Sequence, residues 1–145
     1  YGDLALIERY VAGTTVATVV VEENGTPVAL PPAAFTNPGT SPFSFEARYS
    51  PDLITIEIPA PLPFDALEAT AAAAVTAHQA LGLRDMSRTD VVVDDAGTPW
   101  FLEAAISPGL TETSVLPLAA AEAGRTLGDL LADLLRAAVE RGPNG

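Results

Sequence analysis

Two short apolar runs separated by a tight polar turn constrain the fold of this chain more than any other feature. The runs are Val91 to Val93 and Trp100 to Leu102, and Asp94-Asp-Ala-Gly97 lies between them. Asp and Gly accept the backbone angles of a tight turn, whereas β-branched residues favour extended backbone. The pattern therefore predicts a β-hairpin whose antiparallel arms are the two runs.

Three charged residues lie at the open end of this predicted hairpin. Asp90 precedes the first arm and Glu103 follows the second, so antiparallel pairing places the two carboxylates close together. Arg88 lies two residues before Asp90 and faces the same side of an extended strand. Facing acids attract positive charge, and their oxygens suit a hard divalent cation. The alternative is structural, with two solvated strand ends that pair with Arg88.

The order of residues around the hairpin resembles one enzyme family. Arg88-Thr-Asp90 is followed by Leu102-Glu-Ala-Ala105, then by Ser107-Pro-Gly-Leu-Thr111 and by Ser114. This order is similar to the end of the D-alanine–D-alanine ligase family, the ATP-grasp ligases of cell-wall precursor synthesis. The family pattern is an Arg-x-Asp strand, Glu-x-Asn, a Pro-Gly-Met/Leu-Thr turn and a Ser shortly afterwards.

The resemblance implies a role for each matching position. Asp90 and Glu103 look like magnesium ligands, and Arg88 is similar to the arginine that holds the acyl phosphate and the tetrahedral intermediate. Gly109 and Ser114 look like the groups that receive the carboxylate of the second amino-acid substrate. The implied cofactors are ATP and magnesium.

Near the start of the chain, the resemblance extends to the nucleotide. Ile7 to Val11 is similar to the family's hinge strand, whose backbone meets adenine, which implies nucleotide contacts from Glu8, Arg9 and Val11. Soon afterwards the family has a Glu that binds ribose, whereas this chain reads Gly-Thr-Thr15. A neutral hydroxyl replaces only part of that contact.

Pro, Gly and Ser are concentrated between Pro31 and Pro51, a composition typical of a loop. Taken alone, it predicts a surface excursion held by aromatic side chains. Phe45-Glu-Ala-Arg48-Tyr is, however, similar to Tyr-Glu-Ala-Lys-Tyr on the family's mobile loop, which closes over the phosphates. The resemblance gives Arg48 the place of a phosphate-binding lysine, with the charge kept.

The remaining segments predict the rest of the architecture. Asn24-Gly25 predicts a second hairpin, because Asn-Gly is the strongest short hairpin signal. Further elements are predicted from β-branched content, apolar periodicity and capping residues. They are strands at Leu4 to Val11, Val16 to Val21, Val28 to Leu30 and Leu53 to Ile58, and helices at Phe64 to Leu81, at Val115 to about Gly124 and after Thr126. We expect one α+β domain, residues 1–145, with a mostly antiparallel sheet and helices packed on one side, like the C-terminal half of an ATP-grasp fold.

Composition excludes several classes of partner. All seven basic residues are Arg, and the net charge of −12 opposes binding to nucleic acid or to an anionic membrane. No apolar run approaches a membrane span, and the lack of Cys fits a reducing compartment, so a cytoplasmic location is expected. The single histidine, His78, has no ligand-type neighbour at helical spacing and is predicted to lie at the surface or at a helix end, without a role.

Two functions remain open. One is the C-terminal ATP-grasp portion of a D-alanine–D-alanine ligase-like carboxylate–amine ligase, inactive as an isolated chain because the family's Gly-rich loop and phosphate lysines are not in this sequence. The other is a catalytically degenerate ligase-fold domain used for binding or assembly. It is favoured by Ala105, which stands where the family pattern has a metal-ligating Asn. Apolar sheet surface left uncovered where the other half of an ATP-grasp fold would lie predicts a homodimer or a heteromer, with contact through Val16 to Val21 or through the 31–51 loop and not through the last helix.

Overall fold

The computed structural model describes residues 5–36 and 55–142. The elements follow one another as β1 (Thr14–Glu23), β2 (Thr26–Ala29), β3 (Ala33–Thr36), β4 (Thr55–Glu57), α2 (Phe64–Ala80), β5 (Met86–Val93), β6 (Pro99–Ala105), α3 (Val115–Glu122) and α4 (Leu127–Arg141). The sheet has the order β4-β3-β1-β5-β6, with β2 also paired to β1, and every pairing described is antiparallel. The predicted α+β class with a mostly antiparallel sheet is confirmed.

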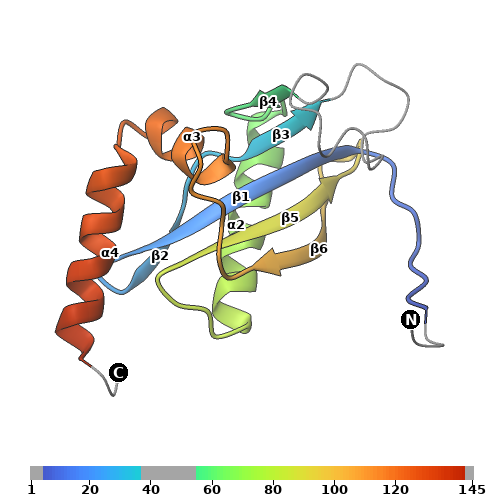
Figure 1. Cartoon of the computed structure of the whole chain (residues 1–145). Coiled ribbons are helices and arrows are strands. Elements are labelled where there is room, and N and C mark those ends of the chain that lie inside the picture. Colours follow the sequence, from blue (N-terminus) through green and yellow to red (C-terminus); the bar gives the residue numbers. More distant parts are fainter. Residues whose placement is uncertain (1–4, 37–54, 143–145) are drawn as a thin grey trace.

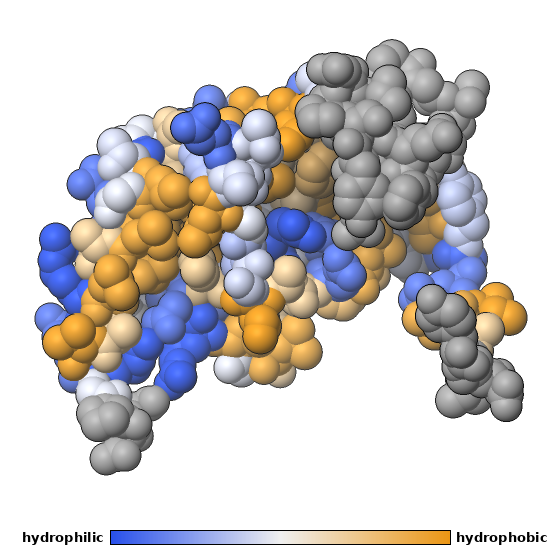
Figure 2. Space-filling model, viewed as in Figure 1, coloured by the Kyte–Doolittle hydropathy of each residue, from blue (hydrophilic) through white to orange (hydrophobic). Residues whose placement is uncertain are grey.

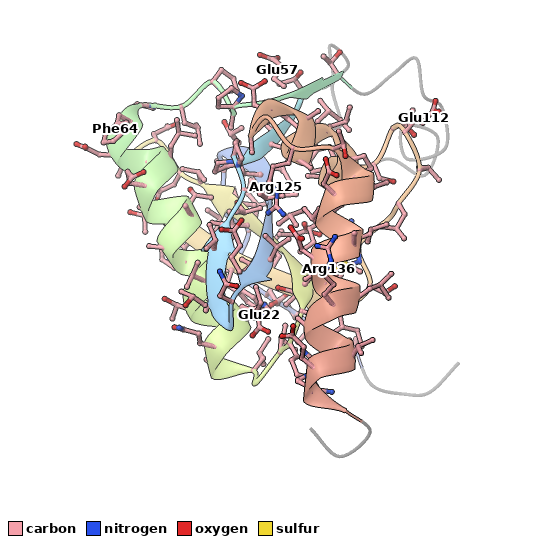
Figure 3. The ribbon with its side chains drawn as sticks, turned by 90° about the vertical axis from the view of Figure 1, so that its left-hand side faces the viewer. Glu22, Glu57, Phe64, Glu112, Arg125 and Arg136 are labelled. Carbon is pink, nitrogen blue, oxygen red and sulfur yellow. The ribbon has the colours of Figure 1, made fainter. Side chains whose placement is uncertain are left out.

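β1 is the central strand because it carries apolar side chains on both of its faces. Val16 belongs to a core cluster with Ala66 of α2, whereas Ala17 and Val19 belong to a second cluster with residues of α3 and α4. Figures 1 and 3 show the resulting layers, with α2 on one face of the sheet and α3 and α4 on the other. The helices thus cover both faces of the sheet, whereas the sequence predicted helices on one side only. A single helical layer would leave half of β1 in water.

The burial of β1 also corrects the predicted contact surface. Residues 16–21 are each between 0 and 1% exposed. They are covered within the chain and cannot form the interface of an oligomer. Among the described residues, the large apolar side chains that are exposed include Leu6, Ile7, Tyr10, Val28, Phe64, Leu81, Trp100, Phe101, Leu102, Ile106, Leu110, Leu135 and Val139.

The hairpin predicted at Asn24-Gly25 is confirmed. Val20 opposes Ala29 and Val21 opposes Val28 across β1 and β2. The turn residues Asn24 and Gly25 have φ values of 52° and 76°. Positive φ at both positions suits a two-residue turn between antiparallel strands, and Asn and Gly tolerate it best.

Two predictions on irregular segments are corrected. Ala33–Thr36 forms β3 inside the predicted 31–51 loop, pairing with both β1 and β4. Its short length and the prolines just before it concealed the strand. Conversely, residues 5–12 are irregular where a hinge strand was predicted, and Ile7 is 91% exposed. No described strand pairs with this segment, so an extended conformation would give it neither backbone hydrogen bonds to a neighbouring strand nor burial of its apolar side chains. Residues 37–54, which include Arg48, lie outside the described residues.

The buried face of α2 is more polar than its sequence suggested. The helix ends before Gly82, as predicted, and two of its four buried residues, Ala66, Thr70, Ala74 and His78, are polar. His78 is only 1% exposed, and its Nδ1 lies 2.8 Å from the Ser87 hydroxyl of β5. His78 lies in the last turn of α2, at the predicted helix end, but it is buried and not at the surface, because Ser87 supplies a hydrogen-bond partner that permits burial.

The last helix, α4, packs against the sheet through leucines and is tied to it by ion pairs. Thr126 Oγ1 accepts a hydrogen bond from the Asp129 N–H at 3.0 Å, the predicted N-terminal cap. Leu130 and Leu134 are buried on the side that faces the sheet, whereas Leu135 is 67% exposed. Figure 2 shows apolar residues along this helix and hydrophilic ones gathered between it and the sheet.

Arg125 crosses the gap between β1 and α4 (Figure 3), donating to Glu23 at 2.6 Å and to Asp133 at 2.8 Å. Arg141 near the end of α4 pairs with Asp85 at 2.7 Å. These pairs belong to a cleft of about 1000 Å³ between α4 and the β1–β2 hairpin. None of the described helices is long and apolar enough to cross a membrane.

Candidate functional site

A register shift in the β5–β6 hairpin determines where the predicted acids point. Near the turn, Val92 opposes Trp100 and Val91 opposes Phe101. A regular ladder would then place Leu102 opposite Asp90, but a bulge leaves Leu102 unpaired and places Glu103 there instead. A shift of one residue moves a side chain to the other face of a strand. The bulge therefore brings the two carboxylates to one face, as the sequence predicted.

Arg88 occupies the space beside these carboxylates. Its Nε donates to Asp90 Oδ1 at 2.8 Å and its Nη2 donates to Asp90 Oδ2 at 2.7 Å, a two-point ion pair. The same Nη2 lies 3.8 Å from Glu103 Oε1. Burial raises the pKa of Asp90 above 3.8, and the nearby Glu103 adds to this, although Arg88 acts in the opposite direction. The ionised Asp90 carboxylate is thus poorly hydrated and depends on a positive partner.

The side chains near Asp90 offer few ligands for a metal ion. No group of three or more His, Cys, Asp or Glu side chains able to hold a metal occurs among residues 5–36 and 55–142. Ala105, opposite Arg88 in the ladder, contributes no side-chain oxygen. Magnesium commonly uses one or two protein carboxylates together with substrate phosphates and water. Asp90 and Glu103 therefore fit an ion that arrives with phosphates, once Arg88 leaves Asp90, but they do not form a complete site alone.

Beside the acid pair, a cavity of about 210 Å³ brings together the three residues predicted to be catalytic. Arg88 reaches it from β5, and Gly109 and Ser114 reach it from the loop between β6 and α3. The rest of the lining is Phe35, Ile56, Pro108, Thr113, Val115 and Leu116. A cation and hydroxyl groups among apolar walls are suited to a small molecule with one anionic end.

The hydroxyl of Ser114 is directed away from its usual helical partner. Ser114 is the N-cap of α3 but makes no side-chain capping bond. Its Oγ lies 2.8 Å from Thr111 Oγ1 instead. Gly109 leaves room for it, because a Cβ at that position would lie 2.5 Å from Ser114 Oγ. The Pro-Gly-Leu-Thr motif contains Thr111, but sequence reasoning assigned it no role.

The residues predicted to contact the nucleotide do not converge on this cavity, unlike the three residues predicted to be catalytic. Glu8, Arg9 and Val11 lie in the irregular segment, and none of them lines the cavity. The Arg9 guanidinium lies 4.4 Å from the centre of the Trp100 ring. Trp100 lies on β6 and is partly exposed.

Asp94 also holds Trp100 in place. The Trp100 indole N–H donates to Asp94 Oδ2 at 2.8 Å, while the backbone N–H groups of Ala96 and Thr98 donate to Oδ1. The bonds from Trp100 and Thr98 lower the pKa of Asp94 below 3.8. A turn aspartate six residues before a tryptophan was the available sequence signal for this contact.

Comparison with known proteins places these features in a family context. Residues 1–136 match the family model described as D-ala D-ala ligase C-terminus. The chain is 35% identical over 140 residues to the D-alanine–D-alanine ligase of Pelotomaculum thermopropionicum, covering 97% of this chain and 43% of the relative. It is 36% identical over 134 residues to that of Oleidesulfovibrio alaskensis, covering 92% of this chain and 42% of the relative.

Solved structures give the same result. The D-alanine–D-alanine ligase from Bacillus anthracis superposes with a TM-score of 0.72 and 27% identity over 93% of this chain and 44% of its own. The same enzyme complexed with ATP superposes with a TM-score of 0.71 and 26% identity, with the same coverage. The chain thus spans less than half the length of the proteins that it matches.

Proposed function

The chain belongs to the D-ala D-ala ligase C-terminus family, and on that premise we propose that it forms the C-terminal catalytic portion of an ATP-dependent carboxylate–amine ligase. The convergence of Arg88, Asp90 and Glu103 beside the cavity that contains Gly109 and Ser114 carries this proposal. D-alanine and ATP are the proposed substrates, in keeping with the names of the relatives and with the ATP complex of a structural neighbour.

Arg88 has the central role in this arrangement, because it touches both the acid pair and the cavity. In the reaction, ATP transfers its terminal phosphoryl group to the carboxylate of one amino acid and leaves as ADP. The amine of a second amino acid then attacks the acyl carbon, loses a proton and expels inorganic phosphate as the amide bond forms. Negative charge then develops on the phosphoryl oxygens and on the oxygen of the attacked carbonyl. A guanidinium fixed beside them stabilises that charge in the transition state. Gly109 and Ser114 would receive the carboxylate of the attacking amino acid.

Asp90 and Glu103 would hold magnesium together with the phosphates of ATP. The ion, when bound, supplies charge neutralisation on the phosphoryl group. The guanidinium of Arg88 has to leave Asp90 for this, and it then becomes free to meet the substrate. Glu8, Arg9, Val11 and Arg48 remain the proposed nucleotide contacts, with the first three in an exposed segment that a nucleotide would order.

Binding to the isotope-labelled chain tests this proposal directly. D-alanine at millimolar concentration should shift the backbone NMR signals of Gly109 and Ser114, and MgATP should shift those of Asp90 and Glu103. Arg88→Ala should suppress the D-alanine response, since Arg88 lines the cavity, and Asp90→Asn should suppress the MgATP response. Shifts confined to other parts of the chain would contradict the assignment of the site.

The isolated chain should not release phosphate from ATP in a D-alanine-dependent manner. Much of a ligase's rate comes from orienting two amino acids and a nucleotide, and the basic groups of the chain are only seven arginines. A colorimetric phosphate assay decides this point. D-alanine-dependent release that Arg88→Ala abolishes would show that this portion is sufficient for catalysis.

Ala105 favours a second candidate, a ligase-fold domain that binds substrates without reacting them. It lies opposite Arg88 in the ladder and adds no ligand to the acid pair. Ala105→Asn should raise the Mn²⁺ affinity of the chain several-fold under the first function, because an amide oxygen joins two carboxylates already in place. An unchanged affinity would favour the second function.

A further inference from the structure

We propose that Thr111 is a positioning residue that aims the Ser114 hydroxyl at the carboxylate of the bound amino acid. This inference rests on the proposed function of the cavity, and it assigns Thr111 a part in recognising that substrate. Thr111 does not line the cavity, so it acts through Ser114 and not by contact.

The first observation is that the Ser114 side chain does not make the capping hydrogen bond that is available to it at the start of α3. A serine at an N-cap normally accepts a hydrogen bond from an N–H in the first helical turn. In α3 that bond is absent, although the backbone of Ser114 is extended, as an N-cap requires. Its hydroxyl is bonded to Thr111 instead, and Ser114 is one of the residues that line the cavity.

The second observation is the direction that this bond requires. A hydroxyl has one proton to donate, although it can accept through its lone pairs. When Thr111 Oγ1 donates to Ser114 Oγ, the Ser114 proton stays free to donate into the cavity. Donation in the other direction would leave only Ser114 lone pairs, which repel a carboxylate. Binding of an anion therefore selects the order Thr111 to Ser114 to substrate, and each donor strengthens the next.

The third observation is that side chain and backbone are separable here. The Ser114 N–H donates to the Thr111 carbonyl at 2.8 Å, which closes the turn without help from the threonine side chain. Thr113 offers only a long contact, with its Oγ1 at 3.5 Å from Thr111 Oγ1. Thr111→Val thus removes the hydroxyl, keeps the shape and leaves the turn bonded.

The test compares Thr111→Val, Thr111→Ser, Ser114→Ala and the Thr111→Val/Ser114→Ala double variant in the full chain. D-alanine binding is followed by the NMR signals of Gly109, and the side-chain rotamer of Ser114 by its scalar couplings. Thr111→Val should weaken D-alanine binding about 3- to 10-fold, the usual value of one hydrogen bond, and should average the Ser114 rotamer. Thr111→Ser should restore both properties.

The double variant separates positioning from a merely structural role. If Thr111 acts through Ser114, adding Thr111→Val to Ser114→Ala should cost no further affinity. An equal additional loss in the double variant, or an unchanged Ser114 rotamer in Thr111→Val, would overturn the inference. Failure of the proposed function looks different, because the wild-type chain would then show no D-alanine response at Gly109 whatever the rotamer of Ser114.

Discussion

The β5–β6 hairpin with its following loop and the segment of residues 5–12 both carry residues assigned to one reaction, but only the hairpin has a defined geometry. In the hairpin, a ladder to β1, the bulge at Leu102 and a core beneath the strands hold Arg88 and Asp90 in place. The N-terminal segment has no strand partner among the described residues, and it contacts β6 where the Arg9 guanidinium lies over the Trp100 ring. A motif specifies a site only where the chain itself supplies the contacts that orient it.

A core substitution should separate the two regions most strongly. Leu116 is fully buried and forms part of the cavity lining, whereas Ile7 is almost fully exposed. Leu116→Ala should lower the free energy of unfolding by about 2–5 kcal/mol, because it leaves a void, and Ile7→Ala should change it by less than about 0.5 kcal/mol. Urea denaturation measures both. Comparable losses would mean that residues 5–12 are packed against the domain.

A single methyl group in the loop after β6 should impair binding without unfolding the chain. Gly109→Ala places a Cβ only 2.5 Å from the Ser114 hydroxyl oxygen, which has to move. We expect D-alanine affinity to fall roughly tenfold, as for loss of a hydrogen bond to a charged group. Calorimetric titration measures the affinity, and circular dichroism monitors the fold. Gly128→Ala in α4 is the matched control, since its nearest neighbour is 3.8 Å away and its D-alanine affinity should not change.

Removing Arg88 should strengthen metal binding to the isolated chain. Arg88→Gln frees both oxygens of Asp90, so Mn²⁺ affinity measured by water-proton relaxation should rise several-fold, while Asp90→Asn should abolish the gain. Arg136→Gln is the charge-matched control, because it also removes an arginine that is paired with an aspartate. An Mn²⁺ affinity in Arg88→Gln equal to that of the wild type would argue against a cation site between these acids.

The two aspartates at either end of the first hairpin arm, Asp90 and Asp94, should have pKa values that are shifted in opposite directions. The pKa of Asp94 is lowered, so its stabilising contribution is present above the ordinary value of 3.8 and is lost as pH falls through the lower folded value. The pKa of Asp90 is raised, so the folded state gains stability as pH falls from the higher folded value towards 3.8. Carboxyl-carbon NMR should resolve both. The same pKa for the two groups would mean that burial and hydrogen bonding do not differ between them.

The sequence was sufficient where local chemistry decides the structure. The Asp94 to Gly97 turn, the Asn24-Gly25 turn and the Thr126 cap each depend on a few adjacent residues, and all three are found as predicted. Convergence of Arg88, Gly109 and Ser114 followed from a family resemblance, since nothing in local spacing brings the loop after β6 to β5.

The remaining features depend on contacts that one sequence does not reveal. Burial of His78 requires Ser87 on a strand across from the helix. β3 is a strand because β1 and β4 flank it, not because Ala33 to Thr36 favours extension. The helices cover both faces because β1 is apolar on both, a property that predicts burial without saying which helix covers which face.

The unpaired Leu102 has a further consequence for the behaviour of the molecule in concentrated solution. β6 is one of the edge strands of the sheet among the described residues, and it exposes Phe101 and Leu102. Regular apolar edge strands invite another chain to add on and thereby start aggregation. A bulge distorts the edge, and Pro99 at its start has no N–H to offer an incoming strand. The irregularity that aligns two acids therefore also makes this edge a poor template for fibril growth.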